Sequence, residues 1–187
     1  MVKTASLMND LHSPLPSFLL LDPLTNEQVG VQDVMLHRGL VVYFICNHCP
    51  YVIHVQDSLV AVANDYLSKG VGFVAISAND PVGYPEDSPS AMAKVAKQQM
   101  YPFPYLFDET QSIARAFAAS CTPDIFVYNA DAQLYYRGQL DEARPGLDLS
   151  SDGGSLRVAL NAMLAGEKAD SFPQKPSLGC NIKWKQV

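Results

Sequence analysis

The chain has 187 residues, a length that favours one domain with room for a substantial core. Hydrophobic residues make up 48% and charged residues 17%, which is typical of a globular protein and excludes a disordered one. The net charge is -6, with no block of like charge. Because phosphate binding needs clustered lysine and arginine, we expect no nucleic-acid partner.

The N-terminal residues, MVKTASLMND, contain no apolar core of signal-peptide length. The longest apolar runs, such as residues 40–46, are far too short to cross a bilayer, so we expect no membrane partner either. Without an export signal, we expect a cytoplasmic protein. In that reducing compartment, cysteines serve chemistry or metal binding more often than structural disulfides.

The first half of the sequence alternates between apolar runs and a helical pattern. A short apolar run at 18–22 ends at a turn. The run at 40–45 is unbroken, β-branched and aromatic, which fits a strand buried on both faces. Apolar residues at helical spacing extend from 52 to 66, and a second buried strand is predicted over 71–78.

The second half adds further helices and a hairpin. A turn at 129–132 separates two strand-like runs, which indicates antiparallel pairing. In chain order, the predicted elements are a helix that begins at Pro89 with Ser88 as its N-cap, a short apolar segment at 103–107, a helix at 108–119, strands at 125–128 and 133–137, and a helix at 156–164.

This order predicts an α/β protein with a mixed central sheet flanked by helices on both faces, since early alternation favours parallel strands and the late hairpin is antiparallel. We assign residues 1–166 to one domain. The tail at 167–187 is interrupted at Pro173, Pro176 and Gly179 and shows no period. It is expected to form an extended C-terminal arm packed on or beside the domain.

The sequence FICNHCPYV places Cys46 and Cys49 directly after the buried strand, where a helix is predicted to begin. Helix N-termini favour anions, and a thiolate is the reactive form of cysteine. We therefore expect Cys46 to have a lowered pKa and to attack first, and Cys49 to resolve the mixed disulfide. Asn47 and His48 are the tuning positions, because a protonated His48 beside the thiolate would stabilise the reduced form.

These features resemble the thioredoxin superfamily, and within it the redoxin branch related to alkyl hydroperoxide reductase and thiol-specific antioxidant proteins. The similarity runs from about 18 to 144 and includes the segments FLLLD, LVVYFI, CNHC, GFVAISAND, FPYLFDET and CTPDIFVYN. It implies a thioredoxin-like fold in which Thr122 and Pro123 form the substrate-side wall of the site, joined by a cis bond. It also implies thiol chemistry without a cofactor.

Two departures from the thioredoxin pattern concern the residues around the first cysteine. Ile45 stands where the superfamily usually has tryptophan, and Asn47-His48 replaces the usual Gly-Pro. Disulfide-introducing members of the superfamily have a histidine at the same position, and the sequence resembles them in this respect. The resemblance to a general thioredoxin reductant is correspondingly weaker.

The peroxiredoxin pattern, Pro-x-x-x-Thr-x-x before the peroxidatic cysteine, is absent. Counting back from Cys46 gives Tyr43 and Gly39, and counting back from Cys49 gives Cys46 and Val42. The alternative function is a thiol-dependent peroxidase, acting as a peroxiredoxin-like antioxidant. Because the pattern is absent, we expect its turnover to be slower than that of a peroxiredoxin.

The remaining cysteines leave further readings open. C-x-x-C is half of a common zinc ligand set, which His54, Cys121 and Cys180 could complete in a structural zinc or interaction module. Cys121 lies two residues before Pro123 and is either a small buried hydrophobe or a redox thiol. Cys180, in the tail SLGCNIKWKQV, is either a third exchanging thiol or held by neighbouring apolar residues.

We therefore predict a cytoplasmic thiol–disulfide oxidoreductase that uses a Cys46–Cys49 pair and needs neither cofactor nor metal. Its expected partners are protein or small-molecule thiols and disulfides, together with a thiol reductant.

Overall fold

The computed structural model describes residues 3–8 and 10–186. The strands of the central sheet are β2 (Leu19–Asp22), β3 (Glu27–Gly30), β4 (Gly39–Phe44), β5 (Val71–Ser77), β6 (Tyr105–Phe107), β8 (Asp124–Asn129) and β9 (Leu134–Gly138). Three further strands form a small separate sheet: β1 (Lys3–Ala5), β7 (Cys121–Thr122) and β10 (Leu178–Asn181). The helices are α1 (Val31–Val34), α2 (Pro50–Leu67), α3 (Pro89–Gln98), α4 (Ser112–Ala116) and α5 (Gly154–Ala165), with a short 3-10 turn, η1 (Pro85–Asp87).

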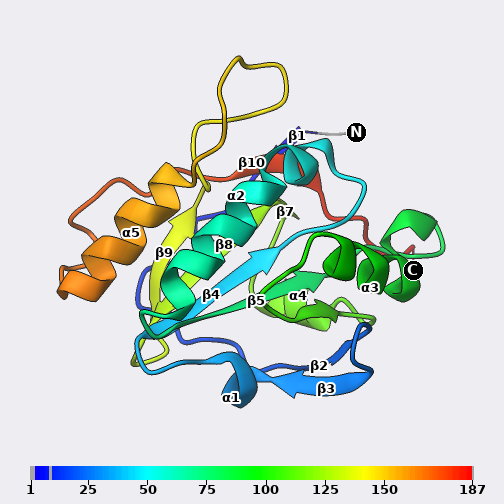
Figure 1. Cartoon of the computed structure of the whole chain (residues 1–187), viewed down its shortest axis with the longest axis horizontal. Coiled ribbons are helices and arrows are strands. Elements are labelled where there is room, and N and C mark those ends of the chain that lie inside the picture. The colour runs from blue at the N-terminus through cyan, green and yellow to red at the C-terminus, as the bar shows by residue number, and fades with distance from the viewer. Residues whose placement is uncertain (1–2, 9, 187) are drawn as a thin grey trace.

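The central sheet is mixed, as predicted. One run of strands has the order β3-β2-β6-β5, and a second has the order β4-β8-β9. The two runs meet where β4 lies beside β5, and the Ile45 amide donates to the Ile76 carbonyl at 3.1 Å (Figure 1). The pair β5–β6 is parallel, whereas β8 and β9 form the predicted antiparallel hairpin.

Strand β4 is completely buried and serves two cores, one on each face of the sheet. Val41 and Tyr43 point to a core that also contains residues of α2, α3 and α5. Phe44 points to the opposite core and packs edge-on against Phe117, with ring centroids 5.2 Å apart. Because side chains alternate along a strand, this explains why the predicted run is apolar without interruption.

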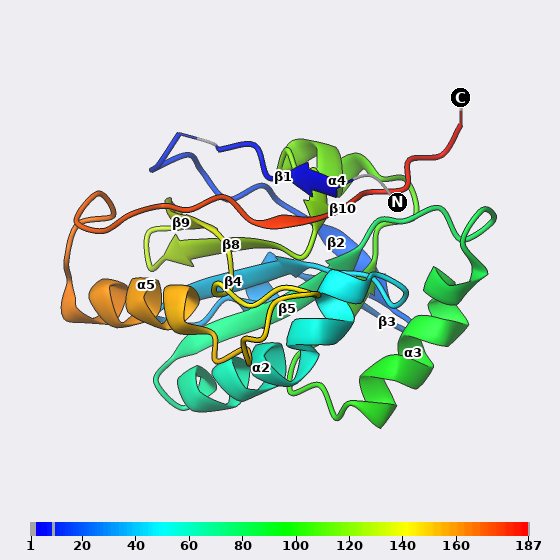
Figure 2. The same cartoon turned by 90° about the horizontal axis from the view of Figure 1, so that it is seen from above.

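Helices lie on both faces of the sheet, which confirms the predicted layering. Figure 2 shows α2, α3 and α5 on one side and α4 on the other, and the residues of α1 pack into the same core as those of α4. The observed α3 has Ser88 as its N-cap and Pro89 at its first position, as expected. Helix α4 is shorter than predicted, since Gln111 before it has a φ of 61° and Asp108 binds the amide of Ala114 at 2.8 Å.

The C-terminal tail contributes strand β10, which the sequence analysis did not predict. Cys180 on β10 pairs with Lys3 of β1 on one side and with Thr122 of β7 on the other, both antiparallel. Strands β1 and β3 and helix α1 were also not predicted. All are short, with three or four residues each, and lack a periodic pattern long enough to recognise.

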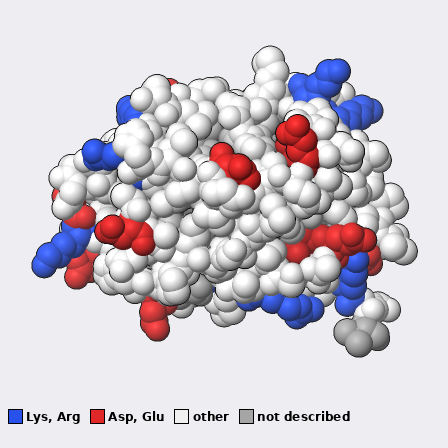
Figure 3. All heavy atoms as spheres, turned by 90° about the horizontal axis from the view of Figure 1, so that it is seen from below, with Lys and Arg blue, Asp and Glu red and all other residues white. Residues whose placement is uncertain are grey.

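Charged side chains on the molecule are mixed in sign. On the face drawn in Figure 3, basic residues lie in small groups among acidic ones, and most of the face carries no charge. Among the described helices, none has the length and hydrophobicity needed to cross a bilayer.

The close pairing of β10 with β7 depends on Gly179. A Cβ at this position would lie 2.0 Å from the carbonyl oxygen of Thr122, which is far inside contact distance. Gly179→Ala should therefore lower the free energy of unfolding by about 1–3 kcal/mol, measured by urea denaturation, because the strand must shift away. Gly83→Ala is the matched control, since its Cβ would meet its nearest atom at 3.4 Å. Equal stability of the two variants would contradict this account.

Candidate active site

The segment between β4 and α2 carries the two cysteines of the motif. The sequence analysis placed the helix start at Cys46, but α2 begins at Pro50 and Cys49 is its N-cap. Proline is favoured at the first helical position, so Pro50 was the signal that could have fixed this boundary. The positive end of the helix therefore acts on Cys49 more directly than on Cys46.

Both sulfurs face Thr122. The Sγ of Cys46 lies 3.4 Å from the Thr122 hydroxyl oxygen, and the Sγ of Cys49 lies 3.2 Å from the Thr122 carbonyl oxygen. The two thiols also shift the pKa of one another. Cys46 is 2% exposed and Cys49 is fully buried, so both thiols lie beneath the surface.

The pKa values of the two cysteines are shifted in opposite directions. A hydrogen bond from the Cys46 thiol, with smaller help from the Cys180 thiol and the Thr122 hydroxyl, lowers the pKa of Cys49 to about 5 against the effect of burial. The same hydrogen bond raises the pKa of Cys46, and burial and the charge of Asp87 raise it further. The lowered pKa that the sequence analysis expected at Cys46 is thus found at Cys49.

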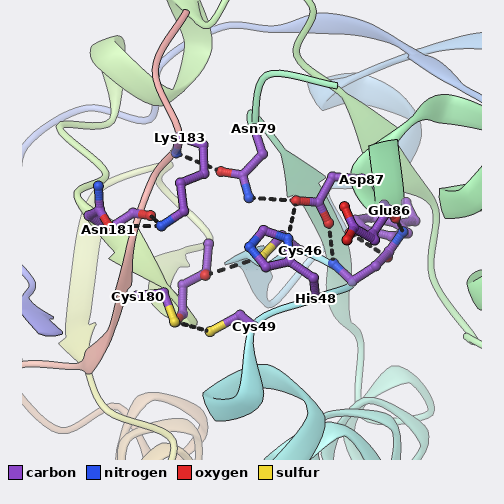
Figure 4. Close-up of polar contacts among 12 residues, drawn as sticks. Cys46, His48, Cys49, Asn79, Glu86, Asp87, Cys180, Asn181 and Lys183 are labelled. Carbon is purple, nitrogen blue, oxygen red and sulfur yellow. Dashed lines mark hydrogen bonds and ion pairs between the residues drawn. The ribbon is translucent and has the colours of Figure 1, made fainter. Parts of the chain in front are cut away.

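His48 is held by a carboxylate that the sequence analysis did not single out. Its Nδ1 donates to Asp87 at 2.6 Å (Figure 4). Its ring stacks on Tyr84 with centroids 5.1 Å apart. Asp87 is fully buried. Its carboxylate also accepts from the Asn47 amide and the Asn79 side chain, both at 2.7 Å. This arrangement fixes the orientation of the ring beside Cys46.

Asn47 points away from the sulfurs. Its side-chain amide donates to the carbonyl of Glu86 at 2.7 Å, and its side-chain oxygen accepts from the Tyr105 hydroxyl at 3.2 Å. Together with its main-chain bond to Asp87, these contacts attach the cysteine loop to η1. The contact with Asp87 itself is made by the main-chain amide of Asn47.

The bond between Thr122 and Pro123 is cis, as the resemblance implied. Thr122 faces both thiols, but its backbone is paired with Cys180 of β10. The Sγ of Cys180 lies 3.0 Å from that of Cys49. The Sγ of Cys121 faces instead the carbonyl of Pro123 at 3.6 Å, and burial raises its pKa, which is typical of an inert packing thiol.

Three groups could hold a metal ion. Cys46, His48 and Asp87 offer ligand atoms that lie within 4.8 Å of one another, a combination that suits zinc. Both carboxylate oxygens of Asp87 already accept hydrogen bonds within the protein. His54, a ligand considered from the sequence, is exposed on α2.

A cleft of about 880 Å³ is separated from the pair by the stacked rings of Tyr84, which lines it, and His48, which does not. One wall contains Asp80 and Tyr84, the ring that stacks on His48, and the other consists of residues 181–186 of the C-terminal arm. The ammonium of Lys183 lies 5.6 Å from the Tyr84 ring centroid. One wall thus belongs to the loop that leads to Asp87, and the other belongs to the arm that carries Cys180.

Comparison with known proteins identifies related sequences and structures. The model of the AhpC/TSA family matches residues 11–137. No curated protein is significantly similar to the sequence. An uncharacterised conserved protein from Geobacillus kaustophilus is 49% identical, with a TM-score of 0.96 over 100% of this chain and 98% of that one. A hypothetical protein from Sinorhizobium meliloti is 38% identical, with a TM-score of 0.94 over 98% of this chain and 100% of that one.

A more distant structure confirms the fold. A thiol:disulfide interchange protein of the thioredoxin family, from Chlorobium tepidum, has a TM-score of 0.63 at 16% identity, over 84% of this chain and 99% of that one. The predicted thioredoxin-like architecture is therefore correct.

Replacing Cys46 tests the shared proton. Cys46→Ala removes the main donor to Cys49, so the pKa of Cys49 should rise from about 5 toward the ordinary thiol range. The pH dependence of iodoacetamide alkylation, read by mass at Cys49, measures this shift. Cys121→Ala is the control and should leave the profile unchanged. An unshifted pKa in Cys46→Ala would show that another group stabilises the thiolate.

Proposed function

Because the chain belongs to the AhpC/TSA family, we propose that it is a thiol–disulfide oxidoreductase whose redox pair is Cys46 and Cys49. One observation carries this proposal. Two thiols meet at the start of α2 against Thr122, beside a cis Thr-Pro bond, and hydrogen bonding within this group lowers the pKa of Cys49 despite its burial. Thiolates, unlike thiols, attack disulfides.

Cys46 is the attacking sulfur in this proposal. The sulfur of Cys49 is enclosed by the Thr122 carbonyl and by Cys180, whereas Cys46 adjoins His48, whose ring stacks on Tyr84 of the cleft wall. Transfer of the shared proton from Cys46 to Cys49 leaves Cys46 as the thiolate. The preference for Cys46 thus follows from access, and Cys49 stores the charge between reactions.

The reaction proceeds through two exchanges. Cys46 attacks one sulfur of a substrate disulfide, forming a mixed disulfide and releasing the other substrate sulfur as a thiolate. Cys49 loses its proton and attacks the Sγ of Cys46, which releases the second substrate thiolate. Two electrons pass to the substrate, its two thiolates take up two protons, and the pair becomes a disulfide. A thiol reductant, of the kind that a reducing cytoplasm contains, restores the pair by the reverse sequence.

His48 and Asp87 tune the pair in opposite directions. The charge of Asp87 raises the pKa of Cys46, so this carboxylate favours the oxidised form. His48 binds Asp87 at 2.6 Å and, when protonated, offsets its charge. The balance between these two side chains decides whether the protein is a stronger oxidant or a stronger reductant.

The cleft beside Tyr84 is the proposed approach for substrate. The edge of β7, where the resemblance places a substrate-side wall, is covered by β10. A thiol or disulfide compound, or an extended protein segment, would instead enter between Asp80 and the arm residues 181–186. It would reach Cys46 past His48.

Substitution of each cysteine tests this function. Cys46→Ser should abolish exchange with a disulfide substrate, because the attacking sulfur is lost. Cys49→Ser should accumulate mixed disulfides on Cys46, since the resolving sulfur is lost. Intact mass after acid quenching, in the presence of oxidised glutathione, measures both.

The same experiment separates the alternatives. Cys121→Ala is the control and should behave as the unaltered protein. Full exchange activity in Cys46→Ser would refute the assignment of the attacking sulfur. Consumption of hydroperoxide that depends on Cys46, without disulfide exchange, would support the peroxidase alternative. One zinc bound per chain, with both thiols protected from oxidation, would support the structural alternative.

The tuning pair gives a further prediction. Asp87→Asn should raise the fraction of reduced pair at a fixed glutathione ratio by shifting the equilibrium about tenfold, the effect of one pKa unit. His48→Ala should shift it the opposite way, because the charge of Asp87 is then uncompensated. A glutathione titration of each variant measures the shift. His54→Ala, a histidine exposed on α2, is the matched control. Shifts of the same sign in both variants would rule out opposed tuning.

A further inference from the structure

Cys180 reaches the redox pair from the C-terminal arm. It lies 131 residues beyond Cys49 in the sequence, yet the two Sγ atoms are 3.0 Å apart (Figure 4). Cys180 is 2% exposed and belongs to the same apolar core as Cys46 and Cys49. Three of the four cysteines thus meet at one place.

The position of Cys180 is set by backbone pairing. It lies opposite Thr122, whose carbonyl faces the Sγ of Cys49, and its other neighbour in the small sheet is Lys3 of β1. Gly179 permits this approach, because any side chain there would strike the Thr122 backbone. A strand paired on both edges holds its side chains in fixed directions.

The arm is also attached beyond Cys180. The Lys183 amide donates to the side-chain oxygen of Asn79 at 2.8 Å, and the Lys183 carbonyl accepts from the Asp80 amide at 2.9 Å. Asn79 in turn binds Asp87. Contacts on both sides of Cys180 therefore keep its sulfur at the pair.

We propose that Cys180 is a third redox thiol that forms a disulfide with Cys49, which rests on the proposed function of the Cys46–Cys49 pair. The Cys180 thiolate attacks the Sγ of Cys49 in the Cys46–Cys49 disulfide. The Cys49–Cys180 bond forms, the Cys46–Cys49 bond breaks, and Cys46 leaves as a thiolate that takes up the proton lost by Cys180. The number of oxidised sulfurs does not change.

This step moves the disulfide inward and returns Cys46 to its thiol form. The protein then holds its disulfide, which can accept two electrons, on Cys49 and Cys180, while Cys46 can react again. The arm, otherwise attached by hydrogen bonds, becomes covalently tied to the start of α2. Burial raises the pKa of Cys180 to about 12, so the transfer should accelerate as the pH rises.

Trypsin separates the two disulfides cleanly. Trypsin cleaves after lysine and arginine except before proline. It places Cys46 and Cys49 on one peptide, residues 39–69, and Cys180 on another, residues 169–183. Cys121 lies on a third peptide, residues 116–137. A Cys46–Cys49 disulfide removes two hydrogens from a single peptide, whereas a Cys49–Cys180 disulfide joins two peptides.

The experiment oxidises the full chain with limiting diamide, quenches it with acid, alkylates it and maps the tryptic peptides. The unaltered protein should yield both the internal disulfide and the joined peptides 39–69 and 169–183. Cys46→Ala should give only the joined peptides, and Cys180→Ala only the internal disulfide. Cys121→Ala should match the unaltered protein. If Cys46→Ala does not fold, fragmentation of the joined peptides from the unaltered protein should assign the bond to Cys49, and assignment to Cys46 would overturn the proposal.

Each failure has a separate meaning. Absence of joined peptides from both the unaltered protein and Cys46→Ala would overturn the role of Cys180, while an internal disulfide in Cys180→Ala would uphold the proposed function. Joined peptides in Cys46→Ala without an internal disulfide in Cys180→Ala would overturn the Cys46–Cys49 pair and retain Cys180 as a redox thiol.

Discussion

The site depends on the position of Thr122. Its hydroxyl lies against the sulfur of Cys46, its carbonyl lies against the sulfur of Cys49, and its backbone pairs with Cys180. The bond that follows it is cis. One residue therefore sets the distances among three thiols that come from distant parts of the chain. A displacement of this backbone would change the geometry of every sulfur contact at once.

The polar groups around the pair form a second connected set. His48 binds Asp87, Asp87 binds Asn79, and Asn79 binds the backbone of Lys183 in the arm. The arm that carries Cys180 is thus linked to the residue expected to tune Cys46. Because buried polar groups are costly when unpaired, loss of the arm would also leave Asn79 without one of its partners. Docking of the arm and electrostatics at Cys46 are physically coupled.

Local sequence signals predicted much of this site. The apolar run of β4, the C-x-x-C motif and the helical spacing of α2 are each contiguous, so their pattern is visible without a structure. Other parts depend on contacts across long sequence distances. Asp87 is 39 residues from His48 and lies in a short 3-10 turn, and β10 is a four-residue strand with no alternating pattern. Neither its partner strand nor the meeting of Cys180 with Cys49 has a local signal.

The protonation of the thiols shows why burial alone does not decide reactivity. Cys121 and Cys49 are both fully buried, yet burial raises the pKa of Cys121 while that of Cys49 is about 5. The difference lies in the surrounding donors. Hydrogen bonding with Cys46, and to a smaller extent with Cys180 and Thr122, lowers the pKa of Cys49, whereas the charge of Asp124 raises that of Cys121 further. A low-dielectric site strengthens such bonds, so the burial that silences an isolated thiol favours a thiolate whose donors are already in place.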